Sequence, residues 1–484
     1  MPSRSSRIVS RSLSLLVAAT LLSVIVPVGL ASAQPANINI SQRPGNEAED
    51  AIAVNPTDPS NIVAMSTLPG PVSGLFEGVS FDGGQTWTRQ IIGDGTDQLG
   101  EICCDQQLSW DEFGNLWMVY LFSGSNGNVP IALSTDGGLT FQKVAEVVPT
   151  KPKGIGPSGN IGSKGNRASA KGVASADQPS IAAGAGSVWV SYTSYPATVV
   201  QAARAPVTGL GQFGEFGTPV TVPTQRGVGN FGDTSVGPDG QVMVIYQDQT
   251  SGQGGARIYT ALDSDGLGPD GFDAPRFFAR TRVGGFDYLP AQPDRSVDSE
   301  ANLAWDRSGG THEGRVYAIW TRELKNESDN MDIMLRHSDD DGASWSSARR
   351  LNDDTGTNSQ INPAIAVDQT TGNVAASWYD ARRDHGAGGA GDTDGIPNDD
   401  VQLWATYTTN GGATFAPNFR VSQGTTNASV DITGSGFNLG DYTHAAFESG
   451  TFYPAWSDNS NSTGDNPDGT LHQLDLYTAK VVIT

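Results

Sequence analysis

The stretch SFDGGQTW, Ser80–Trp87, decides the fold because close variants of it recur along the chain. The variants are STDGGLTF from Ser134, SDDDGASW from Ser338 and TTNGGATF from Thr408. In each string a short carboxylate or amide can accept backbone N–H bonds inside a turn, glycine can take a positive φ, and an aromatic residue follows. We therefore expect structural roles in turns, not catalysis, for the residues at the third position: Asp82, Asp136, Asp340 and Asn410.

Alternating apolar runs surround these turns. Seven such runs are present, namely NIVAMS, LWMVYLF, SVWVSYT, QVMVIYQ, RVYAIWT, NVAASWY and TFYPAW. Each has a shorter apolar run before it and a third run after it, and in most units a fourth run follows. Four strands repeated every ~50–80 residues are typical of a β-propeller with radially arranged blades. We expect an all-β propeller of seven four-stranded blades, with six blades as the alternative.

The two ends of the chain complement each other. The last unit ends at DLYTAKVVIT and has no fourth run, whereas NINISQ, Asn37–Gln42, resembles the fourth run FRVSQ of Phe419–Gln423. We expect the N-terminal strand to pair with the last blade, because a ring closed in this way leaves no exposed sheet edge.

The first 33 residues contain three arginines, an apolar run and the sequence ASA, which is the layout of a secretory signal peptide. We expect cleavage, secretion and a single propeller domain at residues 34–484; an uncleaved anchor is the alternative. No later run approaches the ~20 apolar residues that a membrane span needs. The net charge of −23 argues against a nucleic-acid partner, and we expect a monomer.

Over essentially the whole mature chain, the sequence resembles the sialidase superfamily of Asp-box (BNR-repeat) propellers. The resemblance implies an active site on the face opposite the boxes. It also implies an arginine triad that grips a carboxylate, a Tyr–Glu nucleophile pair and an acid/base aspartate. Sialidases of this family have six blades and carry the first arginine in a Phe-Arg-Ile-Pro motif, whereas the nearest string here is SQRPGNE, which contains Arg43.

Candidate site residues lie in segments expected on the face opposite the turns. Convergent guanidinium groups can hold a carboxylate bidentately, and the arginines on this face are Arg43, Arg226, Arg295, Arg322 and Arg382, of which we assign Arg43, Arg295, Arg322 and Arg382 to substrate binding. Carboxylates occur near the start of most inner strands: Glu49, Asp50, Asp105, Asp177, Asp233, Asp298 and Glu300.

Following the resemblance, Tyr442 is the candidate nucleophile, Glu300 its proton acceptor, and Asp105 or Asp50 the acid/base group. The alternative is structural: each acid caps its strand and Tyr442 fills the channel.

The remaining candidates are a pair of cysteines, two acidic loops and one basic loop. Cys103 and Cys104 are adjacent, so they form a vicinal disulfide at the channel mouth, suited to stacking against a sugar, or a reduced or intermolecular pair. No zinc site follows from them. The loop AGDTDGIPNDD has the alternating aspartates that calcium prefers, and the candidate ligands are Asp392, Asp394 and Asp399.

A plain acidic turn is the other interpretation of that loop, and the same pair of interpretations applies to LDSDGLGPDGFD, with Asp263, Asp265 and Asp270. We expect a structural Ca²⁺ at most and no required cofactor. The basic, glycine-rich stretch 150–172 is either a mobile loop or a lid over an anionic substrate.

These patterns predict a secreted carbohydrate-active protein that binds glycans or glycoconjugates. The leading hypothesis is an exo-sialidase-like glycoside hydrolase that cleaves terminal glycosidic bonds, those of sialylated glycans included. The first alternative is a non-catalytic propeller that binds glycans or a cell surface. The second is a polysaccharide lyase that uses His444 and Arg382. Fold alone does not choose among these three activities.

Overall fold

The computed structural model of the protein describes all residues except 2–33, 71–72, 124–126, 151–174, 250–251 and 431–435. Residues 2–33 of the predicted signal peptide and 151–172 of the basic loop therefore lie outside the described residues. Residues 34–484 form one compact unit. The described part of this unit is built of β-strands, with one short 3₁₀ helix, η1 (Ala428–Val430). Nowhere in the described chain is a helix long and apolar enough to cross a membrane.

Within the described residues, seven antiparallel sheets of four main strands follow one another along the chain as seven blades. Blade 1 contains β2 (Ala48–Val54), β3 (Ile62–Thr67), β4 (Leu75–Ser80) and β5 (Thr88–Ile92). Blade 2 contains β6 (Ile102–Trp110), β7 (Leu116–Phe122), β8 (Val129–Ser134) and β9 (Gln142–Val147). Blade 3 contains β10 (Ser175–Gly184), β11 (Ser187–Tyr195), β12 (Val199–Gly209) and β13 (Gln212–Phe213), with β14 (Val220–Thr221) also paired to β12.

Blade 4 contains β15 (Asn230–Val236), β16 (Val242–Gln247), β17 (Ala256–Asp263) and β18 (Arg276–Thr281). A hairpin of β19 (Asp287–Leu289) and β20 (Gln292–Val297) precedes blade 5, which contains β21 (Asn302–Trp305), β22 (Val316–Glu323), β23 (Met331–Ser338) and β24 (Arg349–Arg350). Blade 6 contains β25 (Gln360–Val367), β26 (Val374–Asp380), β27 (Asp400–Thr408) and β28 (Phe419–Arg420), with β29 (Thr426–Asn427) paired to β27. Blade 7 contains β30 (Ala445–Glu448), β31 (Thr451–Asp458), β32 (Asp475–Ala479) and β1 (Asn37–Asn39), with β33 (Val481–Val482) paired to β31.

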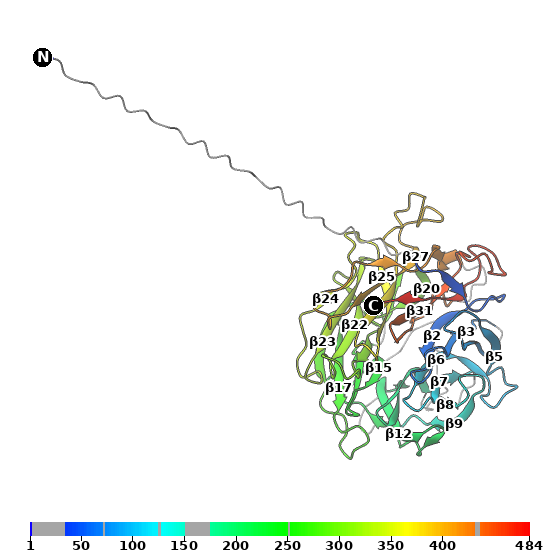
Figure 1. Ribbon diagram of the computed structural model, residues 1–484, viewed down its shortest axis with the longest axis vertical. Coiled ribbons are helices and arrows are strands. Elements are labelled where there is room, and N and C mark those ends of the chain that lie inside the picture. Colours follow the sequence, from blue (N-terminus) through cyan, green and yellow to red (C-terminus); the bar gives the residue numbers. More distant parts are fainter. Residues whose placement is uncertain (2–33, 71–72, 124–126, 151–174, 250–251, 431–435) are drawn as a thin grey trace. The chain divides into compact units, whose positions relative to one another are not determined.

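The blades close into a ring. The first strand of each blade contacts the first strand of the next, and β30 of blade 7 contacts β2 of blade 1. Figure 1 shows the strands following one another round the domain in chain order, with red β31 beside blue β2. The N-terminal strand β1 is the fourth strand of blade 7, where Asn37 pairs with Ala479 and Asn39 with Tyr477. The seven-bladed propeller closed by its N-terminal strand is therefore confirmed.

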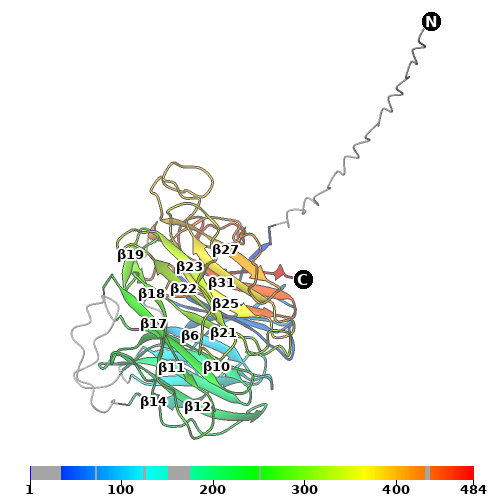
Figure 2. The same ribbon diagram turned by 90° about the vertical axis from the view of Figure 1, so that its left-hand side faces the viewer.

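The hydrophobic core lies between neighbouring blades. One cluster combines Val63 and Val79 of blade 1 with Leu116 and Met118 of blade 2, all of them buried. Figure 2 shows β10, β11 and β12 of blade 3 side by side in one such sheet. Because each sheet covers its neighbour, and a fully buried large apolar side chain contributes about 1.5–3 kcal/mol, no blade is expected to fold alone.

The turns that follow the third strands have a common set of hydrogen bonds. In the first of them, Ser80 Oγ accepts the N–H of Gly84 at 2.9 Å, and Asp82 accepts the N–H and hydroxyl of Thr86 at 2.8 and 2.7 Å. These bonds to Thr86 lower the pKa of Asp82 to about 2. Asp136 and Asp340 accept the N–H and the hydroxyl of the residue four positions later in the same way. In the fourth string Asn410 Oδ1 accepts the N–H of Thr414, and Asn410 Nδ2 donates to the Thr414 hydroxyl.

These four turns join third to fourth strands, so in an antiparallel blade they lie at the end opposite to the start of the first strand. The start of each first strand and the loops between second and third strands therefore share the other face, as expected.

Candidate functional site

The first strand of most blades carries a β-bulge near its start. Register shifts interrupt the pairing at 48/51, 104/107, 177/180, 230/233 and 361/364, so two residues of each inner strand have no partner opposite. The first unpaired residue has positive φ in each, and Glu300 of blade 5 is in the same conformation: Glu49 (61°), Asp105 (59°), Gln178 (42°), Phe231 (46°), Glu300 (36°) and Asn362 (48°). Tyr442 occupies the corresponding sequence position in blade 7.

Six non-glycine residues in this conformation are unusual, because positive φ costs an L-residue roughly 1–3 kcal/mol and is most frequent at functional sites. Contacts between successive blades maintain the bulges. The Gln106 side chain donates to the carbonyl oxygen of Glu49, and the Gln178 N–H donates to Asp105 Oδ2 at 3.0 Å. We call the six positive-φ residues and Tyr442 the bulge ring: Glu49, Asp105, Gln178, Phe231, Glu300, Asn362 and Tyr442.

Arg295 supplies the positive charge of the ring. It lies on β20, and its Nε donates to Asp441 Oδ1 at 2.6 Å while its Nη2 contacts Glu49 Oε1 at 3.0 Å. A second bond joins Nη2 to the other Asp441 oxygen. The guanidinium also lies 4.8 Å from the ring centroid of Phe437, and the backbone N–H of Arg295 donates to Asn438 Oδ1 at 2.9 Å. One cation is thus held between two carboxylates.

Burial and mutual repulsion raise the pKa values of the carboxyl groups around Arg295. Burial, with the charges of Asp177 and Asp441, raises the pKa of Asp105 to about 8. Burial also raises the pKa of Glu49 to about 8, although the charge of Arg295 opposes the rise. The pKa of Asp177 rises to about 6, again mainly through burial. Protonated and ionised carboxyl groups therefore coexist near neutral pH.

Asp105 and Asp441 are bonded to the same residue. The Gln178 N–H donates to Asp105 Oδ2, and the Gln178 side-chain amide donates to Asp441 Oδ2 at 3.3 Å. One glutamine therefore contacts both carboxyl groups, through its backbone N–H and its side-chain amide. Asp105 is 4% exposed, and the Asp441 side chain is 20% exposed.

The predicted nucleophile pair lies in the ring, but its members are not hydrogen-bonded to each other. Tyr442 is buried and its hydroxyl has no hydrogen-bond partner. Burial, followed by the charge of Asp105, raises the pKa of Tyr442 well above its usual value. Glu300 Oε2 likewise has no partner, and burial and Asp298 raise the pKa of Glu300. In this arrangement Tyr442 lacks the proton acceptor that a tyrosine nucleophile needs.

The predicted arginines do not come together. Arg43 pairs with Glu47 at 2.6 Å, and Arg322 pairs with Asp332 at 3.1 Å across the β22–β23 hairpin. Arg226 is largely exposed and lies 3.6 Å from Asp248. Within the part of the chain that the structure describes, Arg295 is the one predicted arginine that pairs with a carboxylate of the bulge ring.

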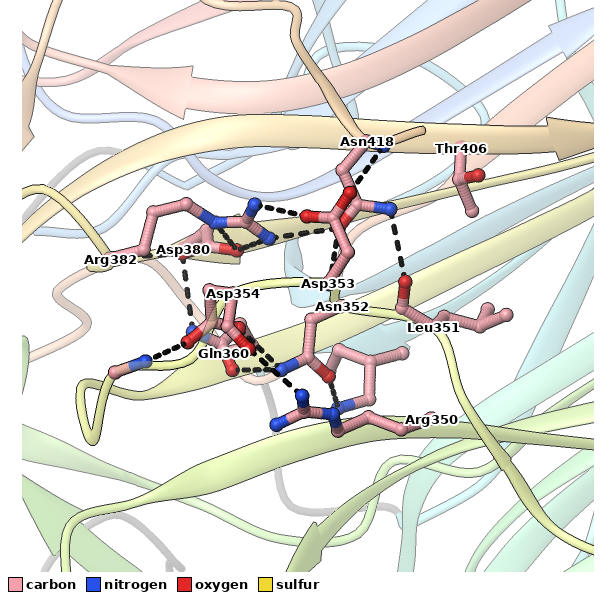
Figure 3. A network of polar contacts seen from close by, with 12 residues as sticks. Arg350, Leu351, Asn352, Asp353, Asp354, Gln360, Asp380, Arg382, Thr406 and Asn418 are labelled. Carbon is pink, nitrogen blue, oxygen red and sulfur yellow. Dashed lines mark hydrogen bonds and ion pairs between the residues drawn. The ribbon is translucent and has the colours of Figure 1, made fainter. Parts of the chain in front are cut away.

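Arg382 belongs to a separate polar network in blade 6, shown in Figure 3. Its guanidinium bonds to Asp380 at 2.9 Å, to Asp353 at 2.7 Å and to Asn418 at 2.9 Å. It also covers the ring of Trp404, 4.1 Å from the centroid. Three polar side chains and an aromatic ring therefore already occupy the guanidinium of Arg382.

Cys103 and Cys104 form a vicinal disulfide on β6, with a Cα–Cα distance of 3.8 Å. Both residues are half-buried, and Asp105 follows them directly. The disulfide therefore adjoins the bulge ring, where part of it is accessible from solvent.

A cavity of about 200 Å³ is lined by first-strand residues of blades 2–7, Asp233 among them. His444, directly before β30, and Arg307, two residues after β21, also line it. His444 Nδ1 lies 3.0 Å from the carbonyl oxygen of Asp50, and burial lowers the pKa of His444. Arg307, which follows the first strand of blade 5, donates a hydrogen bond from its Nη1 to the Ala183 carbonyl oxygen of blade 3 at 3.2 Å. His444 and Arg382, suggested for a lyase, have separate partners and do not form a base–cation pair.

The acidic loop between β26 and β27 brings its aspartates into two groups. Asp384, Asp392 and Asp400 each place an oxygen within 4.8 Å of the others, and so do Asp394, Asp399 and Asp400. The predicted ligands Asp392, Asp394 and Asp399 are therefore divided between two groups that share Asp400.

Sequence reasoning missed several residues of these sites. Asp441 and Gln178 connect the ring, and Asp384 and Asp400 join the acidic loop. A signal was present for two of them, since Asp441 directly precedes Tyr442 in GDYTH and Asp400 directly follows Asp399.

No family model and no curated protein matches this chain. Solved structures with a similar fold include the α-L-arabinanase of Penicillium chrysogenum, at 14% identity and a TM-score of 0.45, with 77% of this chain and 97% of that chain covered. The endosialidase of phage phi92 has 12% identity and a TM-score of 0.48, with coverages of 93% and 69%. The sialidase of Trypanosoma rangeli has 11% identity and a TM-score of 0.40, with coverages of 90% and 55%. Likenesses at this level do not assign a reaction or a substrate to this chain.

Proposed function

We propose that this protein is a glycoside hydrolase whose reaction takes place at the bulge ring. The observation that carries the proposal is the pair Asp105 and Asp441, bonded to one glutamine and in different electrostatic environments. Asp441 forms an ion pair with Arg295, whereas Asp105 has no cation within ion-pair distance among the described residues and a pKa of about 8. Glycoside hydrolysis needs such a pair of one acid and one carboxylate.

In the proposed reaction Asp105 donates its proton to the oxygen of the leaving group as the glycosidic bond breaks. Asp441 attacks the anomeric carbon directly, or removes a proton from the water that does so. The surrounding carboxylates stabilise the positive charge that develops on the sugar ring. Glu49 holds Arg295 from the other side and so fixes the position of Asp441. This scheme replaces Tyr442 as the nucleophile and keeps the predicted acid, Asp105.

The charge of the site favours an uncharged glycan over a sialylated one. Arg295 interacts with five acidic side chains, Glu49, Asp105, Asp177, Asp298 and Asp441, and a sixth, Glu300, lies near Asp298 and Asp441. The single guanidinium is already bonded to two of them, so little positive charge remains for the carboxylate of a sialic acid. The Cys103–Cys104 disulfide offers an apolar surface against which a neutral sugar ring can stack.

The test is hydrolysis of a panel of uncharged oligosaccharides and of α-linked sialosides, followed by NMR of the released sugars. We expect release from an uncharged substrate and a loss of at least about 100-fold in kcat for Asp105→Asn. Asp82→Asn, in an outer turn, is the matched control and retains the wild-type rate. Release of sialic acid alone would contradict the assignment of substrate, and equal rates for wild type and Asp105→Asn would contradict the assignment of the acid.

A non-catalytic glycan-binding propeller is the second candidate, and the absence of a bond to the Tyr442 hydroxyl favours it over a sialidase. Its signature is binding of a glycan without release of sugar by the wild-type protein. We further propose that residues 1–33 are a signal peptide, that the protein is secreted as a monomer, and that the four turns are Asp boxes. Mass spectrometry of the secreted chain tests the first point, because cleavage gives an N-terminus at Gln34.

A further inference from the structure

The aspartates of the acidic loop carry more negative charge than the protein itself neutralises. Five carboxylates come from residues 384–400, and within the described residues none of the five forms an ion pair with a lysine, arginine or histidine. Such a concentration of like charge is costly unless the groups take up protons or bind a cation.

One of the two groups is already satisfied by backbone N–H groups. Asp384 Oδ2 accepts the N–H groups of Asp399 and Asp400 at 2.8 and 2.9 Å. Asp392 accepts the N–H groups of Gly388 and Gly395, both at 2.7 Å. These bonds shape the loop and explain the burial of Asp384 and Asp392.

The other group has an oxygen without a partner. Asp399 is 2% exposed, and its Oδ1 has no hydrogen-bond donor. Its side chain belongs to the group in which Asp394, Asp399 and Asp400 each place an oxygen within 4.8 Å of the others. Asp394 is exposed, so this group is open to solvent. A buried, unpartnered carboxylate oxygen that faces two other carboxylates is the environment of a cation ligand.

The loop is also connected to the bulge ring. Ser429 Oγ donates to Asp399 Oδ2, and Asn427 Nδ2 donates to Asp394 Oδ2, both at 3.3 Å. Between these two residues, the carbonyl oxygen of Ala428 accepts the Asn438 side chain at 3.1 Å. Asn438 Oδ1 in turn accepts the backbone N–H of Arg295 at 2.9 Å. A short chain of hydrogen bonds therefore joins the carboxylates to Arg295.

We propose that Asp394, Asp399 and Asp400 bind one Ca²⁺, and that this ion fixes the 427–429 segment and, through Asn438, the backbone at Arg295. Calcium suits the group because it accepts six to eight oxygen ligands in flexible geometry, and water completes the shell on the exposed side. Magnesium, which needs near-ideal octahedral geometry, is expected to bind more weakly. The importance of the link for catalysis rests on the proposed function, whereas the binding of calcium does not.

Calcium binding is measured directly by titration calorimetry of the metal-free protein with CaCl₂, and by thermal unfolding with and without CaCl₂. We expect one ion per chain and a rise in Tm for the wild type. Asp399→Asn should reduce the affinity at least tenfold and abolish the rise in Tm. Because Asp399 Oδ1 has no partner, this variant should unfold at or above the wild-type Tm when EDTA is present. A misfolded variant would fail that condition, and Asp394→Asn then provides the same test from the exposed side.

The matched control is Asp270→Asn in the other acidic, glycine-rich turn. Among the described residues, the aspartates of that turn do not form a group of three with oxygens within 4.8 Å of one another, and Asp270 is exposed, so this variant should bind calcium as the wild type does. The link to Arg295 is measured by hydrogen–deuterium exchange, and calcium should slow exchange of the Arg295 amide. No binding heat and no change in Tm with CaCl₂ would overturn the site. Binding without a change in exchange at Arg295 would overturn the link. Neither readout depends on hydrolysis, so both separate this proposal from the proposed function.

Discussion

Replacing Arg295 by methionine removes the one cation that, among the described residues, pairs with Glu49 and Asp441. The guanidinium bonds to both carboxylates and lies over Phe437. Loss of one partner from a buried ion pair costs about 3–5 kcal/mol, because the other charge stays buried without compensation. The cation–π contact adds about 0.5–1 kcal/mol. We therefore expect Arg295→Met to lower the free energy of unfolding by about 3.5–6 kcal/mol near pH 8.

The loss should depend on pH in a defined direction. Arg295 lowers the pKa of Glu49, so in Arg295→Met the Glu49 carboxyl binds a proton more readily. At about pH 5 the Glu49 carboxyl, whose pKa is about 8 in the wild type, is protonated in wild type and variant alike, so its ion pair with Arg295 no longer contributes and the destabilisation should shrink. Urea unfolding followed by tryptophan fluorescence at the two pH values measures the difference.

The matched control is Lys143→Met. Lys143 pairs with a single carboxylate, that of Glu146, and about a third of each side chain is exposed (32% and 31%). An exposed pair of this kind is worth about 0–1 kcal/mol, so the control should lose little stability at either pH. Equal losses for the two variants, or a loss for Arg295→Met that is the same at both pH values, would refute the reasoning about the ring.

Three further predictions follow from single features. The hydrolysis rate should fall as the pH rises through about 8, because Asp105 then loses its proton, and a rate that keeps rising beyond that pH would exclude Asp105 as the acid. Gly184→Ala should destabilise the protein by about 1–3 kcal/mol, since an added Cβ would lie 1.6 Å from Arg307 Nη1; Gly217→Ala, with 3.8 Å of space, is the control in thermal unfolding. Burial raises the pKa of Asp50 to about 7, so its folded form is increasingly penalised as the pH rises from about 4 through 7. Asp50→Asn should accordingly raise Tm near pH 8 and leave it unchanged near pH 4, and a lower Tm at both values would contradict this sign.

The β-propeller architecture was predictable because short stretches of sequence determine its strands and turns. Apolar alternation defined the strands, and the four turn strings fixed the order of third and fourth strands. The missing strand of the last unit and the spare NINISQ run predicted the closure that β1 provides. The carboxylates at the start of the inner strands were also recognisable, because a repeated scaffold places equivalent residues at equivalent positions.

The pairing of charged groups was not predictable from the same patterns. Arg382 bonds to Asp380, two residues earlier in the chain, and Arg322 lies opposite Asp332 in its hairpin, so local partners occupy both arginines. The register of that hairpin could have given the second pair. Arg295, by contrast, pairs with Glu49 and Asp441, which are 246 and 146 residues away. Such contacts depend on which distant segments meet at the bulges once the ring has closed, and the sequence around Arg295 does not indicate these partners.

The most direct test of the central claim, a pair of carboxyl groups acting on a glycan at the bulge ring, is chemical rescue of Asp441→Ala by sodium azide. This variant leaves space for a small anion beside Arg295, while Asp105 remains to donate the proton. We predict that the variant alone is nearly inactive on an uncharged glycan, and that azide restores turnover with formation of a glycosyl azide detectable by NMR. A variant that hydrolyses the glycan at the wild-type rate without azide would contradict the claim.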